Sequence, residues 1–182
     1  MSTGSQPSNN PSIMKQRINL RNNNQPAIRV GRTLEGTIFE IIAAVLIVIM
    51  WVVTFILWSR SPETVPTHFG VTGTADAYGN RSAMLIMAAV GTLVTVIMLV
   101  SAYSPSKTIN MPVNVRTPRQ FMIVIRMTRI LAVITPLLFT SIACMMAFPD
   151  SRLAFIFLMV CFVSMIAVAI YSTVKVGRAK NG

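Results

Sequence analysis

Three side chains that could carry acid–base chemistry or bind a metal lie in one polar segment, residues 59–81. They are His68, the single histidine of the chain, and the carboxylates Glu63 and Asp76. Imidazole and carboxylate groups serve as zinc ligands and as general acids or bases. Their spacing matches no metal motif, and no nucleophile–base pair is evident. We therefore expect a structural histidine bonded to the loop backbone or to Asp76, with binding of an external ligand as the alternative, and we predict no metal, no cofactor and no enzymatic activity.

Glu40 is the other candidate, because it is the one acid within a long apolar segment that is placed at membrane depth. Its carboxylate could reach the positive end of its own helix or the interfacial Arg32. Alternatively, it could form a proton or partner site inside a helix bundle, as ionisable residues in membranes often do. The first interpretation is favoured.

Four apolar runs of about 20 residues must position these groups, and they lie near residues 37–58, 82–103, 130–148 and 153–174. Each can cross a hydrocarbon core of about 30 Å at 1.5 Å per helical residue. Only 12% of the residues are charged, against about 25% in a soluble domain. The sequence predicts an all-α integral membrane protein, a four-helix transmembrane bundle with an ordered extracytoplasmic loop and a disordered N-terminal tail.

The net charge of +11 is distributed asymmetrically along the chain. Of the 16 cations, 13 lie before the first run, between the second and third, or after the fourth. This alternation is the positive-inside pattern and places both termini in the cytoplasm. We expect a multi-pass protein of the inner (cytoplasmic) membrane whose cations face the lipid bilayer, and we predict no binding of nucleic acid.

The expected organisation has three parts. A disordered basic cytoplasmic tail covers residues 1–32, the membrane domain covers 33–174, and a second basic cytoplasmic tail covers 175–182. Helices are expected at about 37–58, 82–103, 118–148 and 153–174, joined by the outer loop 59–81 and the cytoplasmic link 104–117.

Two helix faces carry a pattern of their own. Ala88, Gly91 and Thr95 recur at helical spacing in the second run, which favours close packing inside the bundle or, alternatively, self-association into a homo-oligomer. The third helix begins with basic residues interleaved with apolar ones, which favours a start in the headgroup region. A docking face for a soluble cytoplasmic regulator is the alternative there.

The outer loop combines rigid and flexible residues in a way that a simple spacer would not. Its prolines stiffen an extended start, its glycines permit turns, and two aromatic residues, Phe69 and Tyr78, could be buried as anchors. The residues that we single out as a binding or structural motif are Pro62, Glu63, Pro66, Thr67, His68, Phe69, Gly73, Asp76, Tyr78 and Gly79.

This loop resembles the hallmark P-x-x-x-P-T-H-F…G…D-x-[WY]-G of a bacterial membrane domain of unknown function, which also forms the N-terminal part of SdpI-type immunity proteins. A second match follows the second run at residues 109–118. The resemblance covers about residues 33–130 and implies that Pro66, Thr67, His68, Phe69, Gly73 and Asp76 form the signature of the domain. In SdpI-type proteins, immunity implies tolerance of a secreted toxic peptide and membrane capture of a soluble repressor.

These observations favour a non-enzymatic membrane protein whose precise role is unknown, with sensing or immunity at the cell surface as the leading hypothesis. A secreted peptide or a soluble cytoplasmic regulator would be its partner. The alternatives are a small-molecule or ion transporter, which would use Glu40, and a purely structural or interaction subunit of the membrane.

Overall fold

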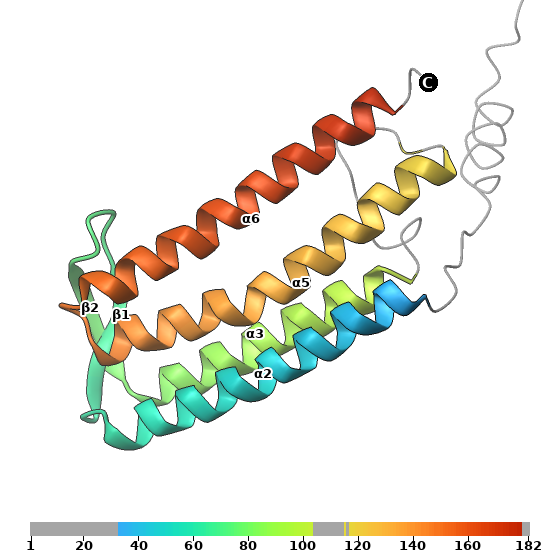
Figure 1. Ribbon diagram of the computed structural model, residues 1–182. Helices are drawn as coiled ribbons and strands as arrows, with labels where there is room; N and C mark the ends of the chain where they lie inside the picture. The colour runs from blue at the N-terminus through green and yellow to red at the C-terminus, as the bar shows by residue number, and fades with distance from the viewer. Residues whose placement is uncertain (1–32, 104–114, 116, 180–182) are drawn as a thin grey trace, which may run out of the picture.

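The computed structural model describes residues 33–103, 115 and 117–179. Within these residues the chain forms four helices and one antiparallel sheet of two strands. Their order is α2 (Leu34–Arg60), β1 (Thr64–Phe69), β2 (Ala75–Asn80), α3 (Ser82–Ser101), α5 (Pro118–Ala147) and α6 (Arg152–Arg178), as Figure 1 shows. All four helices are long and apolar enough to cross a membrane, which is consistent with the predicted multi-pass membrane protein.

Hydroxyl side chains fix where three of the helices begin. The Thr33 hydroxyl accepts a hydrogen bond from the backbone N–H of Gly36 at 3.1 Å, and Ser151 caps α6 in the same way. At the start of α5, Thr117 and Gln120 form a reciprocal capping box. Such contacts satisfy backbone donors that the first turn of a helix leaves free.

The helix bounds differ from the expected ones mainly at the polar ends. α2 begins at Leu34 rather than near residue 37, because Thr33 caps it. α6 continues through Lys175 to Arg178, so the first part of the expected tail 175–182 is helical. The tail 1–32, most of the link 104–117 and residues 180–182 lie outside the described residues.

Helix α5 is the centre of the arrangement, because it packs against α2, α3 and α6. Ala88, Gly91 and Thr95 of α3 are all buried, as their spacing predicts. A Cβ atom on Gly91 would lie 2.6 Å from Cγ of Phe139, so the missing side chain lets α3 and α5 approach closely.

Most apolar side chains of the helices point away from the protein interior. In the most apolar stretch of α6, only 6% of the residues are buried. In the corresponding stretch of α2, 17% are buried. Soluble monomers rarely expose continuous apolar surface of this extent. A surface of this kind is consistent with helices that cross a membrane.

A small apolar core joins the sheet to the helix ends. Val65 of β1, Met84 of α3 and Met146 of α5 are buried together, with Trp58 and Phe69 packed against them. The sheet is thereby fixed to the helices through the apolar face of β1.

Candidate functional site

Within the segment 59–81, residues 64–80 form a β-hairpin, which is not among the elements expected from the sequence. β1 and β2 pair from Thr64 opposite Asn80 to Phe69 opposite Ala75, and the register is irregular on both sides of His68. Such bulges re-aim side chains at sheet edges. Here the irregular register sets the direction of the histidine.

The turn of the hairpin depends on glycine. Gly73 has φ of 81°, a left-handed conformation that glycine adopts without steric cost. Its backbone N–H donates to the carbonyl of Gly70 at 2.9 Å. A Cβ on Gly73 would lie 2.7 Å from the ring of Phe155, so this glycine also lets the turn rest on the first turns of α6.

The hairpin brings His68 and Asp76 together. Nδ1 of His68 lies 2.5 Å from Oδ1 of Asp76, while the two side chains remain 70% and 52% exposed. When Nδ1–H donates to the carboxylate, the hydrogen bond fixes the ring orientation and turns Nε2 outward. The arrangement presents a preoriented imidazole to solvent.

The other predicted motif residues differ in how far they are exposed. Pro66 is buried and Phe69 is partly buried, whereas Tyr78 is 64% exposed, so the expectation that Tyr78 is a buried anchor is wrong. Tyr78 lies opposite Pro66 in the register, so the two side chains lie on the same face of the sheet. A Cβ on Gly79 would lie 2.9 Å from the Thr67 methyl group, so Gly79 gives room to Thr67.

Glu63 and Pro62 lie exposed at the base of the hairpin. Glu63 contributes its backbone carbonyl, which accepts a hydrogen bond from the Arg81 N–H at 2.9 Å. Its carboxylate does not join the His68–Asp76 pair. Among the described residues, no group of three or more His, Cys, Asp or Glu side chains is placed to hold a metal ion.

Arg81 is a residue of this site that sequence reasoning missed. Its Nη1 donates to the carbonyl of Ser61 at 3.0 Å, and its guanidinium lies 5.1 Å from the centre of the Trp58 ring. These contacts tie the end of β2 to the end of α2. The available signal was an arginine directly after the motif, beside a tryptophan at the end of the preceding helix.

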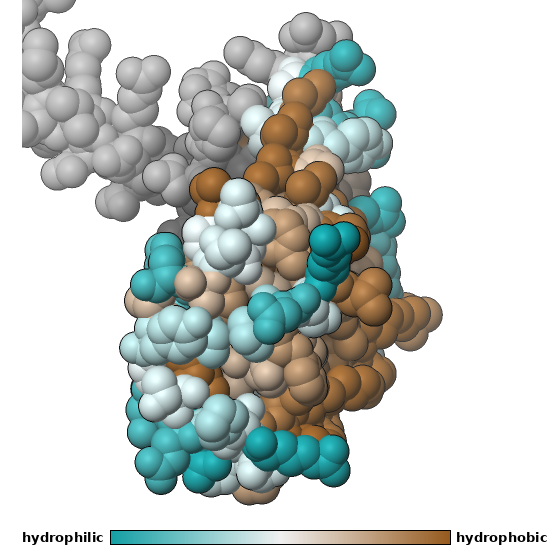
Figure 2. All heavy atoms as spheres, turned by 90° about the vertical axis from the view of Figure 1, so that its left-hand side faces the viewer, coloured by the Kyte–Doolittle hydropathy of each residue, from teal (hydrophilic) through white to brown (hydrophobic). Residues whose placement is uncertain are grey.

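A groove of about 420 Å³ separates the turn of the hairpin from the link between α5 and α6. Thr72, Thr74 and Tyr78 line one wall, and Asp150 and Arg152 line the other. Figure 2 views the molecule from the hairpin end and shows hydrophilic residues spread over this end, with hydrophobic surface along one flank. The end that carries His68 and Asp76 is thus a polar surface with a recess beside it.

Glu40 lies far from the hairpin, near the other end of the helices. It is partly buried and accepts a hydrogen bond from the Tyr103 hydroxyl. Its predicted partner Arg32 lies outside the described residues. Glu40 therefore contacts the residue just beyond the end of α3.

Comparisons with known proteins find similarity over part of the chain, and the family match includes the hairpin. A family model described as "Domain of unknown function (DUF1648)" matches residues 45–92, from within α2 to within α3. An uncharacterized protein of Archaeoglobus fulgidus is 41% identical over 54 residues, which are 30% of this chain and 30% of that protein. The chain thus matches less than a third of this relative, whose archaeal source shows that similar segments are not confined to bacteria. No solved structure matches the chain.

Proposed function

We propose that the chain is a non-enzymatic multi-pass membrane protein that recognises a ligand at the outer surface of the cytoplasmic membrane. The hairpin and the exposed His68–Asp76 pair are the recognition surface. The observation that carries the proposal is the combination of a short 2.5 Å contact with side chains that stay 70% and 52% exposed.

A purely structural pair has little reason to remain exposed. Surface ion pairs contribute about 0–1 kcal/mol to stability, because water and salt screen them. The hairpin is already held by the burial of Val65 and by the hydrogen bonds of Arg81. A role in binding a polar ligand therefore explains the fixed imidazole better than a role in stability does. Another part of the same ligand would occupy the groove beside the hairpin turn.

The proposed orientation follows from charge. The end of the molecule opposite the hairpin carries Lys175 and Arg178, and the sequence before and after the described residues adds further cations. Positively charged segments remain in the cytoplasm during membrane insertion. The charge distribution therefore supports an orientation with both termini inside the cell and the hairpin outside.

The ligand class that we favour is a secreted, membrane-active peptide, as the resemblance to SdpI-type immunity proteins implies. We expect deletion of the gene to sensitise cells to at least one member of a panel of such peptides. His68→Ala and Asp76→Ala should restore little of the lost tolerance, although each protein accumulates in the membrane at the wild-type level. Tolerance is measured as growth inhibition, and protein amount by quantitative immunoblot of membranes.

Val71→Ala is the matched control, because Val71 lies in the same turn region and is 99% exposed. This variant should restore full tolerance. If His68→Ala and Asp76→Ala reduce protein amount and tolerance equally, the pair serves only the fold, and the recognition proposal is wrong.

A transporter is the second candidate, because Glu40 of α2 is partly buried and accepts a hydrogen bond from Tyr103, two residues after the end of α3. Ion-coupled carriers use ionisable groups within the membrane in this way. Solute flux into reconstituted vesicles that is lost in Glu40→Gln would favour this function over recognition. The absence of flux would exclude the transporter and leave recognition, with a structural or interaction subunit as its remaining alternative.

A further inference from the structure

A second pocket lies at the opposite end of the helices from the hairpin. It has a volume of about 490 Å³ and is enclosed by the start of α2, the first part of α5 and the end of α6. Four cations line it: Arg119, Arg126, Arg129 and Lys175. The one acid among the lining residues is Glu35.

Arg129 is the unusual member of this group. It is only 5% exposed, and its Nη2 has no hydrogen-bond partner among the described residues. The guanidinium lies over Gly36, where a Cβ atom would be 2.7 Å from its Cζ, and 5.9 Å from the centre of the Tyr103 ring. A buried charge of this kind is costly unless an anion or acceptor satisfies it.

The position of Arg129 against α2 makes a neighbouring anion still more favourable. Gly36 lies in the first turn of α2, next to the positive end of the helix dipole. Cations are disfavoured there and anions are favoured. A negatively charged group in the pocket, beside Arg129 and the start of α2, would be stabilised by both.

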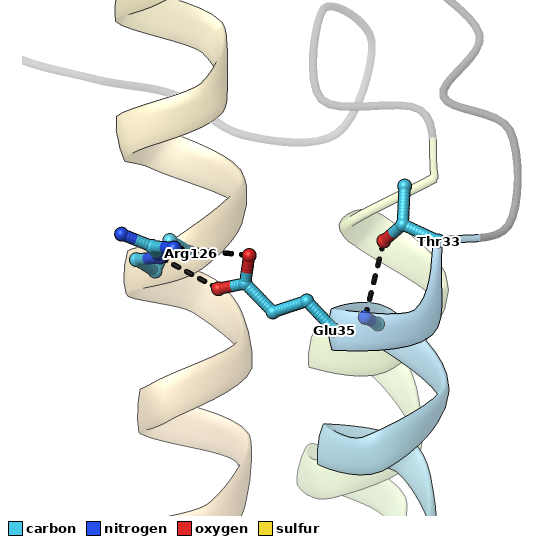
Figure 3. A network of polar contacts seen from close by, with 4 residues as sticks. Thr33, Glu35 and Arg126 are labelled. Carbon is cyan, nitrogen blue, oxygen red and sulfur yellow. Dashed lines mark hydrogen bonds and ion pairs between the residues drawn. The ribbon is translucent and has the colours of Figure 1, made fainter.

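Glu35 does not supply that group. Its two carboxylate oxygens accept hydrogen bonds from Nε and Nη2 of Arg126 at 2.6 and 2.9 Å, which Figure 3 shows between α2 and α5. A bidentate contact of this geometry occupies the carboxylate. The pocket therefore keeps an excess of positive charge.

We propose that this pocket binds the phosphate headgroup of an anionic phospholipid. The cations would contact the phosphate, while Met122, Ile123, Ile130 and Val168, which line the same pocket, would contact the upper part of an acyl chain. Basic pockets between helices are known to hold anionic headgroups at the cytoplasmic face. The apolar lining selects a lipid over a free anion.

The affinity of purified protein for phosphatidylglycerol tests the proposal. We expect phosphatidylglycerol, added in mixed micelles, to bind and to raise the melting temperature, whereas phosphatidylcholine has little effect. Native mass spectrometry counts the bound lipids, and thermal unfolding gives the apparent affinity. Arg129→Gln should weaken phosphatidylglycerol binding by about tenfold to hundredfold, because it removes charge-assisted hydrogen bonds.

Two further variants keep the test valid if Arg129→Gln does not fold. The double variant Arg119→Gln with Lys175→Gln alters exposed side chains at the rim and should weaken binding by at least about tenfold. Glu35→Gln should instead strengthen binding, because it releases Arg126 to contact the phosphate. A role of these residues in folding alone would not produce opposite shifts in lipid affinity.

Arg60→Gln is the matched control, since Arg60 is an exposed arginine at the other end of α2. It removes the same charge and should leave the affinity for phosphatidylglycerol unchanged. The proposal is overturned if Arg60→Gln weakens binding as much as Arg129→Gln, or if phosphatidylcholine binds equally well. It is also overturned if glycerol 3-phosphate, which has a headgroup but no acyl chain, saturates the pocket at the same concentration as the lipid.

Discussion

At the scale of single residues, two glycines set how closely the helices approach each other. Gly91 admits the ring of Phe139, and Gly36 admits the guanidinium of Arg129. Neither adjustment requires an unusual backbone conformation. At both positions glycine is needed because a side chain would collide with the neighbouring helix, and not because the backbone adopts a conformation that only glycine tolerates.

Gly91→Ala should lower the free energy of unfolding by about 1–3 kcal/mol, which is the usual cost of overpacking. The added Cβ would lie 2.6 Å from Cγ of Phe139, so α3 and α5 must separate. Loss of helical circular dichroism with increasing denaturing detergent measures the change.

Gly177→Ala is the matched substitution for this test. A Cβ at Gly177 would have no neighbouring atom within 4 Å, and the residue lies in α6. Its stability should be unchanged or higher by up to about 1 kcal/mol, because alanine favours helix. Equal destabilisation by the two alanines would show that the packing against Phe139 is not the cause.

The sequence shows which side chains could bind or react, but it shows less well where each of them lies in the folded protein. The contact of His68 with Asp76 is one of the two bonds that the sequence analysis expects, and the structure confirms it. The irregular strand register that brings the two side chains together is specified by no local pattern. Tyr78 is an aromatic residue that could anchor the loop, but it pairs with Pro66 rather than with the core residue Val65, and it is 64% exposed. Arg129 resembles the other interfacial cations in sequence, and only the packing of α5 on Gly36 buries it.

At the scale of secondary structure, the helices follow from the sequence and the hairpin does not. Long uncharged runs leave helix as the solution that satisfies backbone groups in hydrocarbon. Thr64–Phe69 contains Pro66, which cannot donate a ladder hydrogen bond and so weakens any strand prediction. The strand forms because Val65 is buried against Met84 and Met146, a contact between distant parts of the chain.

Arg81→Ala should loosen the hairpin while the helices stay folded. The substitution removes the hydrogen bond from Nη1 to the Ser61 carbonyl and the contact with the Trp58 ring. Hydrogen bonds from charged donors contribute about 1.5–3 kcal/mol. We expect amide hydrogen exchange of residues 62–80 to become faster by at least about tenfold, as measured by mass spectrometry.

Arg60→Ala serves as the control for hairpin exchange, because it removes a neighbouring arginine that is exposed at the end of α2. Its exchange should match that of the wild type. Faster exchange throughout α2 and α3 in Arg81→Ala would instead mean that Arg81 stabilises the whole molecule.

At the scale of the whole molecule, polar groups gather at the two ends and apolar side chains cover the length between them. The hairpin end has a recess lined by polar residues, and the other end has a pocket rich in cations. Figure 1 shows the hairpin at one end of the helices and the start of α2 and the end of α6 at the other, so the two proposed binding surfaces lie at opposite ends.

The proposed orientation predicts which end reacts from outside the cell. In a background with Cys144→Ser and Cys161→Ala, we expect Val71→Cys to react with a membrane-impermeant maleimide in intact cells. Arg178→Cys should react only after the membrane is permeabilised. The reverse pattern would place the hairpin in the cytoplasm and exclude recognition of a secreted peptide.

The peripheral place of α6 bears on how the protein is made. Because α6 packs chiefly on α5, a nascent chain that has inserted its first three spans already contains the contacts of α5 with α2 and α3. Helix α6 would then pack against three helices that are already assembled, rather than all four helices packing together at once. We expect biogenesis to be stepwise, with the final span remaining the segment most easily separated from the rest by detergent.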